Sequence, residues 1–426
     1  MKIKYITLLI LLSAIGLQLQ AQTKYSLDGC KQMAIENNRK IKNSILDAEA
    51  AKEAKKEAYT NYFPSVSASG FGFKAKDPFV SMNMGGTKLG LLEDGLGAAV
   101  TLTQPVFVGG KIINSNKLAK LGVEMNTQQV RLSENEVLLQ TENTYWTLIS
   151  LYEKMNTLDF LDKQLASLLK DVEVSYEAGL ITHNDVLQVK LKQNEIRSNK
   201  ANLENGIELC KMSLCQQIGI DIDASVNFDI ERPDVEQPES PATYYVNHRD
   251  ALANRAENIL LEKNIDATKL QTKIKRADYL PSVAVGASYL QNNFIDKWKG
   301  NGALFVSVSV PISGWWGGSH AIKKQRFNEQ VAYNNKVEGQ EQLLLQMQNV
   351  WNELSNEYKQ ILIAKESIDQ SNENLRLNND YYKVGMVALT DLLDAQTLLQ
   401  QSRDNYVEAY SKYQKKRSEY FQVTGR

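Results

Sequence analysis

Cysteine, histidine and proline are scarce in this chain, whose 426 residues include 3 cysteines, 3 histidines and 8 prolines. Cys210 and Cys215 lie five residues apart in a segment expected to be helical, a spacing that does not bring two side chains to one face. We therefore expect buried free thiols and no structural disulfide. His183, His248 and His320 show no metal-ligand spacing, so no metal site is expected.

Charge of neither sign is in excess, because 49 lysines and arginines nearly balance 50 aspartates and glutamates. The formal net charge of −1 gives no basic surface that would indicate nucleic-acid binding. The sequence also lacks a nucleophile–base set, a phosphate-binding loop and a zinc motif. We therefore predict that the chain is not an enzyme, needs no cofactor and binds no nucleic acid.

Long apolar runs are absent except at the start of the chain, where one extends from Ile6 to Ile15. Two lysines precede it and Ala21 follows it, an arrangement typical of a cleaved secretory signal over residues 1–21. The run is shorter than the roughly 20 apolar residues that span a bilayer. Cys30 lies well beyond this run, so we expect no lipid attachment there. Short β-strands that alternate apolar and polar residues give only a weak hydropathy signal, so a search for long apolar runs would not detect them.

The rest of the chain is a tandem repeat. The motif Tyr-Phe-Pro-Ser-Val at 62–66 recurs as Tyr-Leu-Pro-Ser-Val at 279–283, and residues 105–219 align without a gap on residues 311–425. Each copy is expected to contain a helix, two strands, a long helix and another helix. We therefore divide the chain into the signal segment at 1–21, a first repeat at 22–219, an irregular inter-repeat segment at 220–247 and a second repeat at 248–426.

A very long helix is expected in each repeat, because residues 111–177 and 321–383 contain no proline and one glycine each. At about 1.5 Å of rise per residue, the first of these helices would be roughly 100 Å long. Met347, Leu354 and Ile361 belong to a sustained seven-residue repeat of apolar side chains, which is typical of a coiled coil. Four shorter helices are expected to pack along the long ones, at residues 28–60, 185–217, 248–277 and 391–424.

Four segments between the helices alternate apolar and small polar residues, as Leu304 and Val306 do with Ser307. Strands of roughly 9–11 residues with this pattern match a membrane β-barrel with an aqueous lumen, whereas two hairpins on a water-soluble core are the alternative. Four strands with open edges cannot stand alone in lipid, so a barrel requires several copies of the chain. Trp315 and Trp316 suit an aromatic belt at the membrane surface, although two exposed tryptophans in a turn would look alike. The strands are expected at residues 64–73, 96–107, 281–291 and 303–311.

In the order, duplication and spacing of its motifs, the mature chain resembles the TolC-type outer-membrane efflux protein family. The motifs are an opening helix that ends at Asn38, the paired Pro-Ser-Val strand entries, Gln-Pro-Val-Phe at 104–107, and two Gly-x5-Asp turns. The resemblance implies a homotrimer with a twelve-stranded β-barrel, four strands from each subunit, continuous with a coiled-coil α-helical tunnel in the periplasm. It implies a periplasmic adaptor protein and an inner-membrane pump of the RND or ABC type as partners, and lipid of a Gram-negative outer membrane around the barrel.

The resemblance also implies roles for the two turns. Asp391 and Asp394 match an acidic pair that rings the periplasmic entrance, and Tyr382 and Asp185 match a hydrogen-bonded latch that holds it shut. Val387 stands where the best-known members have a gate arginine, so part of that latch is missing. From the residues alone, Asp185 and Asp391 start helices and need only be helix caps. The tips that would dock an adaptor are Ala178, Gly179, Leu180, Val384, Gly385 and Met386.

We therefore predict an outer-membrane channel subunit of a tripartite efflux or type I secretion system. It would conduct drugs, toxic compounds or proteins from the periplasm or the pump to the exterior. A free-standing passive porin is one alternative, but a porin has no need of helices about 100 Å long. A trimeric coiled-coil structural or adhesive surface protein is another, but it would not explain the paired alternating strands or the duplication.

Overall fold

A computed structural model describes residues 25–84, 87–230, 238–294 and 297–426 of the chain. The predicted signal segment at 1–21 lies outside these residues, as does part of the inter-repeat segment. The described residues form two compact units: the first comprises those within 25–44, 130–256 and 341–426, and the second comprises those within 45–129 and 257–340. The division into a signal segment, two repeats and an inter-repeat segment runs along the sequence and stays a prediction.

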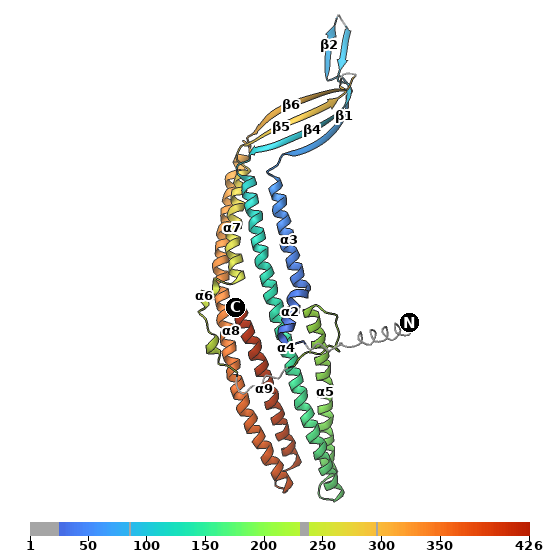
Figure 1. Ribbon diagram of the computed structural model, residues 1–426, viewed down its shortest axis with the longest axis vertical. Helices are drawn as coiled ribbons and strands as arrows, with labels where there is room; N and C mark the ends of the chain where they lie inside the picture. The colour runs from blue at the N-terminus through green and yellow to red at the C-terminus, as the bar shows by residue number, and fades with distance from the viewer. Residues whose placement is uncertain (1–24, 85–86, 231–237, 295–296) are drawn as a thin grey trace, which may run out of the picture. The chain divides into compact units, whose positions relative to one another are not determined.

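Most of the described chain is helical (Figure 1). The two long helices are α4 (Lys111–Glu177), of 67 residues, and α8 (Gly314–Lys383), of 70 residues. Helix α4 has the expected bounds, whereas α8 begins before the expected residue 321. The shorter helices are α2 (Leu27–Asn37), α3 (Arg39–Thr60), α5 (His183–Ile218), α6 (His248–Leu252), α7 (Ala256–Ala277) and α9 (Leu389–Val423), with a 3₁₀ turn, η1, at Pro241–Tyr244.

Two of the four expected shorter helices are broken, so their prediction as single helices was wrong. The first breaks at Asn38, whose extended backbone separates α2 from α3. The Asn38 side chain accepts a hydrogen bond from the backbone N–H of Lys40 (2.8 Å) and donates one to the carbonyl of Gln217 (2.7 Å). The second break, at residues 253–255, separates α6 from α7. At the first break, the hydrogen bond from Asn38 to Gln217 of α5 is a tertiary contact, which local helix propensity does not reveal.

The four expected strands are present and form one antiparallel sheet in the order β1-β4-β5-β6 (Figure 1). Their bounds differ from the expected ones by a few residues. A second sheet of two short strands, β2 and β3, was not expected and lies between β1 and β4 in the sequence. The bounds are β1 (Ser65–Lys74), β2 (Val80–Met84), β3 (Thr87–Leu91), β4 (Asp94–Phe107), β5 (Ser282–Asn292) and β6 (Lys299–Ser309).

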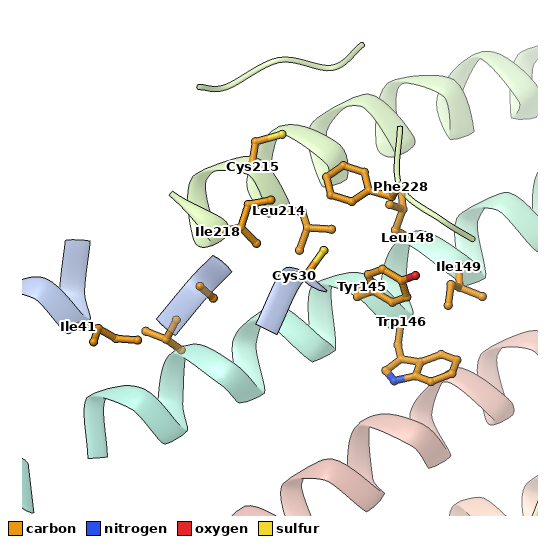
Figure 2. Close-up of a cluster of buried hydrophobic side chains, with 12 residues drawn as sticks. Cys30, Ile41, Tyr145, Trp146, Leu148, Ile149, Leu214, Cys215, Ile218 and Phe228 are labelled. Carbon is orange, nitrogen blue, oxygen red and sulfur yellow. The ribbon is translucent and has the colours of Figure 1, made fainter. Parts of the chain in front are cut away.

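The first unit has a core of buried side chains from α2, α3, α4 and α5, shown in Figure 2. Cys30 and Cys215 are fully buried there beside Leu148 and Leu214, and burial raises the pKa of the Cys30 thiol to about 12. All three cysteines are free, and Cys210 is half-buried. The prediction of buried, free side chains at Cys210 and Cys215 is thus confirmed for Cys215, whereas Cys210 is free but only half-buried.

The apolar seven-residue repeat of α8 lies in a second core of the same unit. Met347, Leu354 and Ile361 are buried and belong to one cluster with Tyr413 and Tyr420 of α9. Burying such side chains stabilises the fold by roughly 25 cal/mol for each Å² of apolar surface removed from water. This packing holds α8 and α9 together as a helical hairpin.

Candidate functional site

The hairpins α4–α5 and α8–α9 of the first unit end in turns of the same geometry. Gly179 follows α4 at φ +72° and Gly385 follows α8 at φ +73°, a left-handed conformation that costs glycine little. The residues after them, Leu180 and Met386, each donate their backbone N–H to the carbonyl five residues earlier, at 2.9 Å. These bonds form the Schellman motif, which terminates a helix. Both long helices therefore stop at a glycine for the same physical reason.

The predicted docking residues lie on the outside of these two turns. Leu180, Val384 and Met386 are 76%, 69% and 72% exposed. A Cβ atom at Gly179 or Gly385 would have no neighbouring atom within 4 Å. Each turn therefore presents uncovered backbone flanked by apolar side chains, a surface that a partner protein could bury.

Both aspartates that begin the following helices act as caps. The Asp185 carboxylate accepts hydrogen bonds from the backbone N–H of Thr182 at 2.9 Å and from the Thr182 hydroxyl at 2.8 Å. The Asp391 carboxylate accepts one from the backbone N–H of Ala388 at 3.0 Å. Asp394 lies one helical turn further on with its side chain exposed. Asp391 therefore has a structural role, whereas no capping bond involves Asp394.

Tyr382, in the last turn of α8, packs against the α4–α5 hairpin. It joins a cluster that includes the buried side chains of Val172 and Val186. Burial raises the pKa of Tyr382, and the nearby carboxylates of Asp185 and Asp171 raise it further. Tyr382 thus lies near enough to Asp185 to feel its charge, and the hydrogen-bonded latch between them stays a prediction.

The four-stranded sheet of the second unit has one apolar face and one polar face. Val66, Leu102 and Leu304 lie in register on the apolar face, together with Ala287. Leu304 is 88% exposed and Val66 is 67% exposed, so this face lacks a cover within the described chain. Small polar side chains occupy the other face, where the hydroxyls of Thr101 and Ser288 lie 3.1 Å apart. Strands β1 and β6 each pair on one side only in the described sheet.

Trp315 and Trp316 lie in the first turn of α8, not in a turn between the last strand and the helix. The indole N–H of Trp315 donates a hydrogen bond to the carbonyl of Tyr279 at 2.9 Å. Trp315 is 49% exposed and Trp316 is 82% exposed. Their indole rings therefore stand at the surface just beyond the end of β6, where a membrane boundary would begin if the sheet lies in lipid.

Sequence reasoning missed an aromatic cluster on the polar face of the sheet, formed by Phe71, Phe73, Phe79 and Phe294. A signal for it exists in the sequence. Phe71 and Phe73 continue the alternation of Ser65, Ser67 and Ser69, so that large rings replace small polar residues on one face.

The described ranges contain no group of three or more histidine, cysteine or acidic side chains placed to hold a metal ion. His248 is buried and its Nε2 lies 3.2 Å from the Tyr420 hydroxyl. His183 and His320 are exposed. Among the helices of residues 25–84, 87–230, 238–294 and 297–426, none is long and apolar enough to cross a membrane.

A family model described as outer membrane efflux protein matches residues 31–219 and 248–426. The chain belongs to this family. The outer membrane protein TolC of Salmonella enteritidis is 20% identical over 433 residues, covering 96% of this chain and 84% of that protein. The alkaline protease secretion protein AprF of Pseudomonas aeruginosa is 18% identical over 394 residues, covering 91% and 81%. The CmeC outer membrane channel of Campylobacter jejuni has the same fold, with a TM-score of 0.82, 15% identity and coverage of 94% and 85%.

Family membership confirms the prediction of an outer-membrane export channel. The protein is located in the outer membrane, and its family is one of channel proteins and not of enzymes. The two matched stretches leave out residues 220–247, the segment that the sequence analysis placed between the repeats.

Proposed function

We propose that three copies of this chain close a twelve-stranded β-barrel in the outer membrane, β1 of one copy pairing with β6 of the next. One observation carries this proposal: the sheet has an exposed apolar face and two unpaired edges. In hydrocarbon, each unpaired backbone group costs several kcal/mol, so a four-stranded sheet must find further strands. The apolar face would then contact lipid, and the polar face of Thr101 and Ser288 would line an aqueous lumen.

Two neighbouring residues of β6 test the assignment of faces. Val306 lies on the apolar face and Ser307 on the polar face. A lysine at position 306 would face lipid and should destabilise the barrel by about 2–4 kcal/mol if it meets the membrane midplane. A lysine at position 307 would face the lumen, where it is tolerated. We expect Val306→Lys to reduce the heat-resistant trimer in outer-membrane fractions, and Ser307→Lys to assemble normally. Equal assembly of both variants, or a monodisperse monomer that conducts in detergent, would contradict the barrel.

The helical hairpins are proposed to form the periplasmic tunnel and to dock a periplasmic adaptor, which links the channel to an inner-membrane pump of the RND or ABC type. The exposed apolar side chains at Leu180, Val384 and Met386, with bare backbone at the glycines between them, support docking at the tips. The efflux family supports export of small molecules as the function, and the relative named for alkaline protease secretion supports export of proteins.

The periplasmic entrance is proposed to be gated by the second turn. Three copies of Asp391 and Asp394 around a narrow pore would attract cations and raise one another's pKa. Tyr382 would bond to Asp185 as the latch of the closed state, since both lie at the same end of the hairpins. Trp315 and Trp316 are proposed to form the aromatic belt at the periplasmic surface of the membrane.

Single-channel recordings separate this function from its two alternatives. A free-standing porin would also conduct, but it would not lose export when the tips are changed. A coiled-coil surface stalk would form trimers without conductance. Conducting trimers whose export activity depends on Leu180 and Met386 support the tripartite channel.

A further inference from the structure

Four phenylalanine rings meet at the end of the sheet that lies farthest along the strands from the helices. Phe71 and Phe73 belong to β1, Phe79 precedes β2, and Phe294 follows β5. The ring centroids lie 5.8 Å apart for Phe71 and Phe294, 5.6 Å for Phe73 and Phe294, and 5.6 Å for Phe73 and Phe79. These separations are typical of favourable aromatic pairs.

Two glycines of the neighbouring strand make room for these rings. Phe71 pairs with Gly97 and Phe73 pairs with Gly95. A Cβ atom at Gly97 would lie 2.9 Å from Phe71, and one at Gly95 would lie 2.6 Å from Phe294. The rings therefore lie close over Gly95 and Gly97 of β4, where a larger residue would displace them. The cluster is a packed part of the polar face and not a set of loose side chains.

Asn293 fixes the position of Phe294 above the sheet. Its side-chain oxygen accepts a hydrogen bond from the backbone N–H of Leu96 at 2.6 Å, and its own backbone N–H donates to the Leu96 carbonyl at 3.1 Å. Despite this packing, Phe71 is 49% exposed and Phe79 is 72% exposed. A sizeable aromatic surface thus faces the same side as the serines and threonines of the sheet.

We propose that this cluster forms an aromatic constriction at the outer mouth of the pore. The inference rests on the proposed barrel, which puts the polar face inside and brings three such clusters to one level. Rings at that level narrow a lumen that is otherwise lined by small side chains. They contact apolar or aromatic cargo as it leaves, and they hinder the entry of large hydrated solutes. This cluster belongs to the second unit, whereas the acidic turn of Asp391 and Asp394 belongs to the first.

A cysteine placed below the cluster tests the constriction. Ser288 lies on the polar face of β5 and pairs with Thr101, four residues along β4 from Gly97, which is about 13 Å of strand. In Ser288→Cys protein on intact cells, we would measure labelling by N-ethylmaleimide and by a bulky polyethylene-glycol maleimide. Protein without the added cysteine supplies the background from the native thiols. Both maleimides reach the cysteine from outside the cell, so the labelling rate does not depend on whether the periplasmic entrance is open.

We expect Phe71→Ala/Phe294→Ala to speed labelling by the bulky maleimide roughly tenfold and to leave labelling by N-ethylmaleimide unchanged. Phe294→Leu, which keeps apolar packing, should give an intermediate rate in case the double variant fails to form trimers. Val100→Ala, on the apolar face of β4, is the control and should label like the parent. Equal bulky-reagent rates in all assembled variants overturn the constriction but not the channel. If N-ethylmaleimide never reaches the cysteine, both the barrel and the constriction are overturned.

Discussion

Asp391 accepts a hydrogen bond of 3.0 Å from the backbone amide of Ala388, and through that bond it caps the last helix of the chain. The same residue is proposed to be one half of the acidic gate. Its two roles can be separated because Asp394, the other half, takes part in no capping bond of this turn and has an exposed side chain. Asp394 therefore contributes only charge, whereas Asp391 contributes both charge and the helix cap.

We expect Asp394→Asn to weaken block by multivalent cations without loss of stability. Asp391→Ala should weaken the block and also cost about 1 kcal/mol through the lost cap. The double change to alanine should raise the blocking concentration roughly tenfold, because it removes every carboxylate of the ring. Planar-bilayer recordings with the cation on the tip side measure the block, and thermal unfolding measures the cap. Glu53→Gln, on α3, is the control. Unchanged block in the double variant would rule the gate out.

The tips are expected to dock an adaptor through apolar contact, and Met386 tests this better than the glycines do. Any side chain at Gly385 is strained by its φ of +73°, so a glycine variant mixes strain with lost docking. Met386→Glu and Leu180→Glu add a charge that must be desolvated on docking, while the turn keeps its backbone. We expect both variants to form normal trimers and to lose export. Met386→Leu should export normally. Normal export by an assembled Met386→Glu trimer would count against docking there.

Tyr382→Phe is expected to raise the probability that the channel is open. Burial and the carboxylates of Asp185 and Asp171 raise the pKa of Tyr382, so its hydroxyl stays protonated at neutral pH and can donate to Asp185. Because the folded pKa exceeds the unfolded value of about 10, the latch is complete below pH 10 and is lost as the pH rises through the folded pKa. Bilayer recordings from pH 7 upward should show alkaline opening in the parent channel. Tyr382→Phe should be open more often already at pH 7, whereas Tyr381→Phe should behave like the parent.

The long helices and the glycine turns that terminate them were predictable because local chemistry determines them. Helix α4 has no proline over its length and stops at Gly179, where a positive φ is needed. The strands were found because their alternation separates an apolar from a polar face. Asp185 and Asp391 could be recognised as helix caps from their position after a glycine turn. Each of these features is visible within a short stretch of sequence.

The errors arose where contacts between distant segments override local propensity. The break at Asn38 depends on a bond to the carbonyl of Gln217, and the early start of α8 accompanies the bond from Trp315 to Tyr279. Three glycines around Trp315 and Trp316 disfavour a helix, so the sequence indicates a turn there. The aromatic cluster needs Phe294 to meet Phe71 across the sheet, and only the register of the strands brings them together.

His248 is expected to make the first unit less stable in acid. Its ring is buried, its Nε2 lies 3.2 Å from the Tyr420 hydroxyl, and the rings of Tyr245 and Tyr420 pack on it with centroids at 5.6 Å and 6.0 Å. Burial lowers the pKa of His248, because the imidazolium form would lose its hydration. The neutral ring is therefore the form that the folded protein accommodates.

The direction of the pH effect follows from this lowered pKa. Above the unfolded value of about 6.5, His248 is neutral in both states and its packing contributes fully to stability. As the pH falls below 6.5, the unfolded chain binds a proton that the folded chain resists, and stability declines until the folded pKa is passed. Hydrogen exchange of the α6 and α9 amides between pH 7.5 and 5 should show this loss of protection. His248→Gln should be less stable at pH 7.5 and should lose less on acidification, whereas His183→Gln, at an exposed position, should follow the parent protein. An unchanged acid response in His248→Gln would assign the effect to other groups.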